Sequence, residues 1–142
     1  MGIQKITLIR PQKPGLIHYD IGDCIRSCCN AAGEETTDLE SVQFDLNLCE
    51  AILEGYLEVA QGFLSPWDLH YLPDCIRLIP LELGLRFLTD HLEGNVYFKT
   101  NRPDHNLQRA AVQFKLAQDI EHQMPALQRL IQRLSDQPVG RH

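Results

Sequence analysis

Apolar residues recur at every third or fourth position along most of this chain, which is the spacing of amphipathic α-helices. The pattern predicts helices over about 16–32, over about 25 residues following Thr37, over about 65–93, over 105–123 and from Pro125 onward. The most continuous apolar stripe belongs to the second helix and consists of Val42, Leu46, Cys49, Leu53, Tyr56, Ala60 and Phe63.

Helix-start signals support two of these segments. Thr37 and Glu40 have the spacing of a capping box, in which a hydroxyl and a carboxylate bond the free amides of the first turn. Ser65 and Pro66 combine a capping residue with a proline at the first helical position. We therefore expect helices to begin directly after Thr37 and Ser65.

Prolines and a glycine divide the segment that follows Ser65. Pro73 and Pro80 each predict a kink or a break, because a proline removes one helical hydrogen bond. Gly94 is a typical helix stop. Asp104 is a candidate cap for the helix over 105–123.

These elements predict an all-α fold of five or six helices in a single domain, 1–142. Within it, 14–135 forms a helical lobe and 136–142 a frayed tail. Residues 1–13 form an irregular leader in which 3–9 could be a short strand without an evident partner.

Composition excludes several classes of function. The chain has 142 residues and a net charge of −6, which argues against binding to nucleic-acid backbones or anionic membranes. No apolar run approaches the length of a membrane span, and the first residues lack the pattern of a signal peptide. We therefore expect a cytoplasmic protein.

The five cysteines are expected to be reduced thiols. Cys24 and Cys28 are four residues apart and would share a helix face. Two thiolates there could hold a metal, but no second pair has zinc-ligand spacing. The favoured interpretation is that the cysteines are small buried residues on a helix, and no metal site is predicted.

Nucleotide-binding and hydrolase motifs are missing from the sequence, including the glycine-rich phosphate loops. The string 18–23 contains His18 and Asp20 and imitates kinase catalytic and metal-binding loops. Ile25 stands where the catalytic loop requires an asparagine. We therefore interpret Asp20 as a helix-start residue that bonds neighbouring amides, and we assign no catalytic residue.

Arg86 is the strongest candidate for ligand binding. It lies one helical turn from both Glu82 and Asp90, so a surface ion pair is one interpretation. The alternative is an arginine presented to an anionic or hydroxyl-rich ligand, with Tyr97 as an aromatic wall. For Phe87 and Tyr97, packing in the core is the simpler expectation.

Three strings carry a resemblance to one known family: 14–26, 81–99, and 105–109 with 113–116. They resemble the C-terminal helical lobe of N-acetylhexosamine 1-kinases, which belong to the aminoglycoside phosphotransferase-like kinases. The resemblance spans about 14–134. It implies the kinase-like helical fold and, for the complete enzymes, transfer of the ATP γ-phosphate to an amino sugar with Mg²⁺.

The resemblance also implies that catalytic parts are missing here. Leu8 and Arg10 stand where the metal-binding aspartates are expected, and neither the catalytic loop nor the ATP-binding lobe is recognisable. The expectation is a truncated C-terminal portion of a sugar kinase, inactive alone, with no cofactor of its own. Its partner would be an N-terminal kinase lobe. The alternative is a non-enzymatic, self-associating module, perhaps a dimer, derived from that lobe.

Position by position, the resemblance implies a candidate sugar pocket formed by Arg86, Phe87, Tyr97 and Ser27. Ser27 stands where those enzymes have a larger apolar residue. Asp20 matches an aspartate that supports the catalytic loop, and Asp23 beside it is also assigned a structural role.

Overall fold

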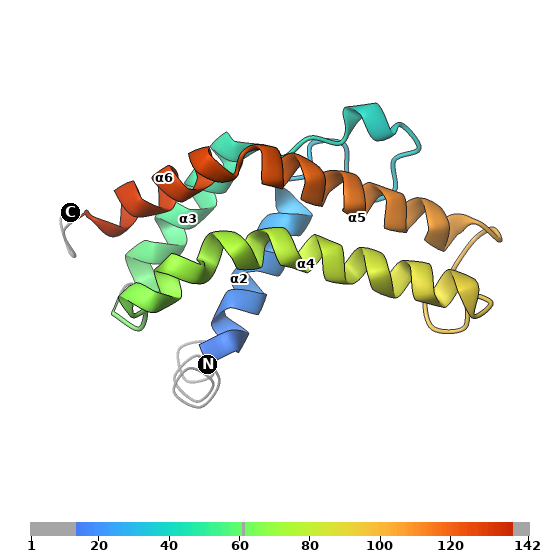
Figure 1. Cartoon of the computed structure of the whole chain (residues 1–142), viewed down its shortest axis with the longest axis horizontal. Coiled ribbons are helices and arrows are strands. Elements are labelled where there is room, and N and C mark those ends of the chain that lie inside the picture. The colour runs from blue at the N-terminus through green and yellow to red at the C-terminus, as the bar shows by residue number, and fades with distance from the viewer. Residues whose placement is uncertain (1–13, 61, 138–142) are drawn as a thin grey trace.

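The computed structural model describes residues 14–60 and 62–137, and within them the chain is all-helical, which confirms the predicted fold class (Figure 1). The possible strand over 3–9 lies outside the described residues. The α-helices and one 3₁₀ turn (η1) are α2 (Pro14–Cys28), η1 (Leu39–Ser41), α3 (Leu46–Ala60), α4 (Pro66–Leu92), α5 (His105–His122) and α6 (Met124–Ser135).

Helices α4 and α5 run side by side along the long axis of the molecule (Figure 1). Helix α2 crosses α4, and α3 packs beside α6 at one end. The core lies between these layers and draws on every α-helix. Its fully buried members include Ile25, Leu53, Ile76, Leu116, Ile120 and Leu127.

Helix α2 ends at Cys28, earlier than the predicted end near residue 32. The cause is the side chain of Asn30, which bonds the backbone locally: its Nδ2 donates to Gly33 O and its Oδ1 accepts from Ala32 N. Such local bonds compete with the helical ladder. Asn30 also forms an isolated antiparallel bridge with Phe44.

The prediction of a helix directly after Thr37 is wrong for its first turns, because α3 begins only at Leu46. Asp38, not Thr37, caps the short η1 turn. The backbone then passes through an extended stretch that α5 holds in place. Phe44 N donates to Asp119 Oδ2 at 2.6 Å, and Gln123 Nε2 donates to Phe44 O at 3.0 Å. These bonds to a distant helix override local helical preference.

Helix α4 begins as predicted: Ser65 and Asp68 form a reciprocal capping box, with Pro66 in the first turn. No break occurs at Pro73 or Pro80, since α4 runs continuously through both. Both prolines are buried, so tertiary packing supports the helix where they remove hydrogen bonds.

The C-terminal half follows the predicted elements closely. Helix α6 buries the predicted stripe of Leu127, Leu130, Ile131 and Leu134. Helix α5 starts at His105, although Asp104 makes no side-chain capping bond there. Leu107 is exposed, and Ala110, Gln113 and Leu116 belong to the buried face of α5.

All five cysteines are free thiols: two are exposed, two are buried and Cys75 is half-buried. Cys24 and Cys28 are exposed, so the expected burial is wrong for this pair. Cys29 and Cys49 are buried in the core, as small apolar side chains are. None of the described helices combines the length and apolar character needed to cross a membrane.

Gly84 allows α4 and α5 to approach closely, because it has no side chain. Substituting it tests the packing of these two helices. A Cβ at Gly84 would lie 2.6 Å from a ring carbon of Phe114, whereas a Cβ at Gly55 on α3 meets nothing within 4 Å. We expect Gly84→Ala to lower the free energy of unfolding by about 1–3 kcal/mol. Gly55→Ala should raise it by about 0.5–1 kcal/mol. Urea unfolding measures both, and equal effects would contradict this packing.

Candidate functional site

A buried carboxylate organises the loop that follows α4. The side chain of Asp90 is only 3% exposed. Its Oδ1 accepts from Val96 N at 3.0 Å and from Tyr97 N at 2.7 Å. Its Oδ2 accepts from Phe98 N at 2.9 Å and from Asn106 Nδ2 at 2.8 Å. This set of donors compensates the carboxylate for lost water and fixes three consecutive backbone amides.

These donors also control the charge of Asp90. Burial favours the neutral acid, but the hydrogen bonds from Phe98, Tyr97, Val96 and Asn106 outweigh it and hold the pKa of Asp90 below its usual range. The carboxylate is therefore ionised at neutral pH. Its negative charge is directed into the loop rather than toward solvent.

The backbone turns sharply between Asp90 and the loop it holds. Gly94 N donates to His91 O and Asn95 N donates to Asp90 O, which together form a Schellman motif. Gly94 and Asn95 have φ values of 96° and 62°, in the left-handed region. Gly94 is thus the helix stop that the sequence predicts.

Tyr97 and Arg86 lie together at the surface that this loop creates. The Tyr97 side chain is 72% exposed, so its expected packing in the core is wrong. The Arg86 guanidinium carbon lies 5.7 Å from the centre of the Tyr97 ring and 5.8 Å from that of Phe98. Among the described residues, Arg86 makes these aromatic contacts in place of the considered ion pairs with Glu82 and Asp90.

Phe87 supports this surface from below. Its ring centre lies 4.5 Å from that of Phe98, and the Arg109 guanidinium lies 5.6 Å from it on α5. Phe87 is half-buried and packs against Phe98 of the loop, outside the hydrophobic core in which it was expected. It therefore acts on Tyr97 through Phe98 and does not line the open surface.

A groove of about 490 Å³ runs beside Arg86 along α4. One side of α4 supplies most of its wall, since positions 82, 86, 89 and 93 succeed one another by single turns. The lining comprises Glu82, Leu85, Arg86, Thr89, Asp90, Glu93, Tyr97 and Phe98. The groove thus offers one guanidinium, exposed carboxylates, two hydroxyls and two aromatic rings.

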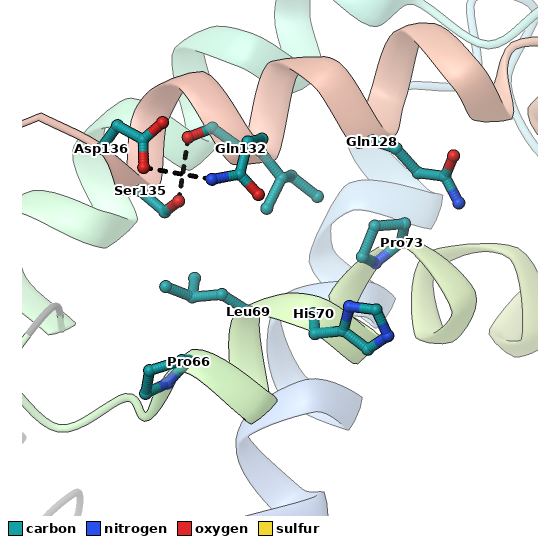
Figure 2. A pocket seen from close by; sticks show the side chains of 9 residues that line it. Pro66, Leu69, His70, Pro73, Gln128, Gln132, Ser135 and Asp136 are labelled. Carbon is teal, nitrogen blue, oxygen red and sulfur yellow. Dashed lines mark hydrogen bonds between the residues drawn. The ribbon is translucent and has the colours of Figure 1, made fainter.

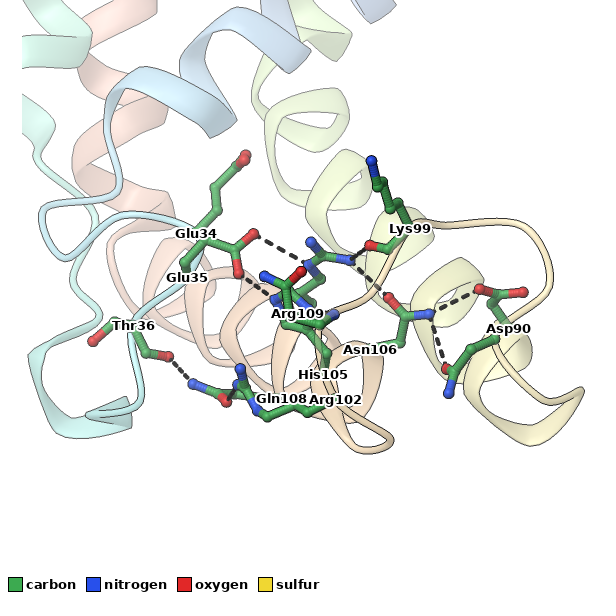
Figure 3. Close-up of polar contacts among 12 residues, drawn as sticks. Glu34, Glu35, Thr36, Asp90, Lys99, Arg102, His105, Asn106, Gln108 and Arg109 are labelled. Carbon is green, nitrogen blue, oxygen red and sulfur yellow. Dashed lines mark hydrogen bonds and ion pairs between the residues drawn. The ribbon is translucent and has the colours of Figure 1, made fainter.

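A polar network behind the loop ties it to two further elements (Figure 3). Arg109 donates to Lys99 O at 2.9 Å and to Asn106 Oδ1 at 3.0 Å, and its Nε donates to Glu35 Oε2 at 3.1 Å. Asn106 in turn donates to Asp90. The network therefore runs from the 34–37 turn through α5 to Asp90.

His105 completes this network at the start of α5. Its Nδ1 accepts from Asn101 N at 3.1 Å, so the ring proton lies on Nε2 and is donated to Glu35 Oε1 at 2.6 Å. Burial alone would raise the pKa of Glu35, but bonds from His105 and Arg109 outweigh it and lower that pKa. Both ring nitrogens of His105 are engaged, which makes its role structural.

The remaining predicted site residues lie elsewhere. Ser27 is exposed on α2 and is not part of the groove wall beside Arg86. Asp20 is exposed in the interior of α2, so its interpretation as a helix-start residue is wrong. Asp23 accepts from Arg26 Nε at 2.9 Å, and Arg26 also pairs with Glu34. Asp23 thus has a structural contact.

A second groove lies between the start of α4 and the end of α6 (Figure 2). It has a volume of about 590 Å³ and is lined by Pro66, Leu69, His70, Pro73, Gln128, Ile131, Gln132, Ser135 and Asp136. Some of its polar groups already bond one another: Gln132 Nε2 donates to Asp136 Oδ1 at 3.1 Å. None of the site residues predicted from the sequence lines this groove, so the groove beside Arg86 is the candidate site.

The described residues do not assemble a metal centre, since no three His, Cys, Asp or Glu side chains among them gather as ligands.

Comparison with models of protein families finds no match to this sequence. The function must therefore be argued from the groove itself.

Replacing the anchor should release the loop while α5 stays folded. Asp90→Asn exchanges one acceptor oxygen for a donor, so the amides of Val96, Tyr97 and Phe98 should exchange with solvent about tenfold faster or more. Hydrogen exchange measured by NMR tests this. Asp104→Asn, which alters an exposed carboxylate paired with Arg102 in the same loop, is the matched control and should change little.

Acid should weaken the same loop. Because the pKa of Asp90 is lowered in the folded state, its stabilising contribution is fully present above the ordinary aspartate pKa of about 3.9. The contribution declines below that value and is lost as the pH falls through the lowered pKa. Protection of the 96–98 amides, corrected for intrinsic exchange, should follow this course and become flat in Asp90→Asn. A loss of protection beginning near pH 6 would contradict it.

Proposed function

We propose that this chain is the sugar-binding helical lobe of a phosphotransferase resembling N-acetylhexosamine 1-kinases. The observation that carries the proposal is the open pair of Arg86 and Tyr97 on the wall of a groove of about 490 Å³. Both residues occupy positions that the family resemblance assigns to the sugar pocket. A loop anchored by a buried aspartate fixes their arrangement before any ligand arrives.

The chemistry of the groove suits a hexosamine. A guanidinium donates hydrogen bonds to sugar hydroxyl or carbonyl oxygens, and the carboxylates of Glu82 and Glu93 accept bonds from hydroxyls. The Tyr97 ring offers an apolar face with a polar tip. A concave, partly aromatic surface with a few convergent polar groups is the usual form of a small-ligand site.

Phosphoryl transfer is not assigned to this lobe alone. That reaction requires positioned metal ions, phosphate clamps and a base acting together. In the sequence, Leu8 and Arg10 replace the metal-binding aspartates that the resemblance leads one to expect. In this proposal ATP and Mg²⁺ belong to a separate kinase lobe, and the present lobe supplies the acceptor sugar.

A second candidate function is assembly. Large apolar side chains are exposed along α4 and the following turn, including Leu85, Leu92 and Val96. Exposed apolar patches of this extent mark association surfaces. This observation favours a binding or oligomerisation module, either in place of sugar binding or together with it.

Titration with N-acetylglucosamine tests the first candidate. Amide resonances between residues 82 and 98 should shift in NMR spectra, and Arg86→Ala and Tyr97→Ala should each weaken binding by about tenfold or more. Ser27→Ala is the matched control. It should leave the affinity unchanged, because Ser27 lies outside the groove.

Three results would contradict the proposal. Amides of 82–98 that do not respond to the sugar would exclude binding in this groove. Magnesium-dependent ATP consumption by this chain, stimulated by the sugar, would contradict the division of labour between two lobes. An effect of Ser27→Ala as large as that of Arg86→Ala would place the pocket elsewhere.

A further inference from the structure

Helix α4 is apolar on two opposite faces. One face packs into the core through residues such as Leu72, Ile76 and Ile79. The other carries Tyr71, Leu78, Leu85 and Leu92, whose side chains are 48–75% exposed. An amphipathic helix of a globular protein normally has one apolar face, which packs on the core. The outer face of α4 therefore lacks a cover within the described residues.

The outer residues repeat at intervals of seven, from Tyr71 through Leu78 and Leu85 to Leu92. Leu81 and Leu88, which are half-buried, fall at the intervening positions where a heptad repeat places its second apolar residue. The run from Leu78 to Leu92 is about 21 Å long. This outer seam has the pattern of a two-stranded coiled coil.

The elements packed on α4 leave the outer seam accessible. Helix α2 approaches near Ile79, which faces Gly22, and α5 approaches near Gly84, which faces Phe114. These contacts flank the seam: Leu78 and Leu85 line a groove of about 590 Å³ whose other walls include Tyr19 of α2 and Phe114 of α5. A second helix that covers the seam would lie in this groove, between α2 and α5.

We propose that the outer seam of α4 binds the same seam of a second copy of this chain, with the two helices parallel. This inference gives the second candidate function its partner and does not depend on sugar binding. The choice of occupant rests on the self-complementary repeat and on two flanking charges. Arg77 and Glu82 lie on opposite sides of the seam, five residues apart, at the g and e positions of the heptad.

The flanking charges also determine the orientation. In a parallel pair, the g position of one helix faces the following e position of the other, so Arg77 meets Glu82 of the second copy twice by symmetry. In an antiparallel pair over the same stretch, e positions face e positions and g positions face g positions, so Glu82 meets Thr89 and Arg77 meets His91, and neither charge gains an oppositely charged partner. The charges therefore favour the parallel dimer.

Asp74 limits the length of the dimer seam. It occupies a seam position one turn before Leu78, is exposed, and would face its own copy across the two-fold axis. Two carboxylates facing each other repel. The stable contact therefore runs from Leu78 to Leu92, and Asp74→Asn should tighten the dimer.

Sedimentation equilibrium at several protein concentrations tests the dimer and its orientation. The native chain should approach twice its mass of 16.2 kDa. Leu78→Glu should shift it to the monomer, whereas Leu48→Glu, at an exposed leucine on α3, should not. Arg77→Glu and Glu82→Arg should each weaken the dimer about tenfold or more, and the double exchange should restore it.

Any other result of these measurements overturns one part of the dimer proposal. A native chain that stays monomeric at all concentrations, or a dimer that survives Leu78→Glu, refutes the seam. A dimer that forms but is not restored by the double charge exchange refutes the parallel arrangement. Because Glu82 and Leu85 line the groove and also belong to the seam or its flank, the sugar titration is repeated with the monomeric Leu78→Glu variant. A native chain that stays monomeric but binds sugar contradicts only the dimer, and a Leu78→Glu monomer that binds no sugar contradicts only the sugar site.

Discussion

The bond set around Asp90 is the constraint on which the rest of the candidate site depends. A buried carboxylate is tolerated only when donors replace its water, and here three consecutive loop amides and Asn106 do so. The same bonds set the direction in which the chain leaves α4 and the place where Tyr97 emerges. They also join the end of α4 to the start of α5. The exposed pair of Tyr97 and Arg86 is therefore a consequence of a buried charge, and the Glu35–His105–Arg109 contacts support it from the other side.

The sequence predicted the helices best where local signals and tertiary contacts agree. The Ser65 cap, the Gly94 stop and the apolar stripe of α6 are local features, and all three are confirmed. The prediction failed between Thr37 and Leu46, where the periodicity is helical but the amide of Phe44 bonds Asp119 on a distant helix. At Pro73 and Pro80 the chain does not break, because packing holds a helix that local chemistry disfavours. No local pattern reports such long-range bonds.

The candidate site was only partly visible in the sequence. Arg86 and Tyr97 were singled out, and they do lie together. For Asp90 the sequence suggests only an ion pair, because it lies one helical turn from Arg86. In the structure its donors are backbone amides beyond the end of the helix. Asn106 lies in one of the strings that carry the family resemblance, which was the available signal for it. Ser27 shows the reverse error: a position inherited from a resemblance does not line this groove.

Helix α4 contributes to the core, to the groove beside Arg86 and to the outer seam. The groove and the outer seam share residues. Leu85 and Glu82 line the groove beside Arg86, and both also belong to the outer seam or its flank. When such a shared residue contacts a second copy, the contacts that it can offer to a ligand change, and the reverse also holds. Under the two proposals, linkage requires that the change in sugar affinity caused by dimer formation equal the change in dimer affinity caused by sugar binding. Asp90 lies near the end of the same helix, and its hydrogen bonds hold the loop that carries Tyr97. The same bonds limit how far α4 can move to suit both the groove and the outer seam.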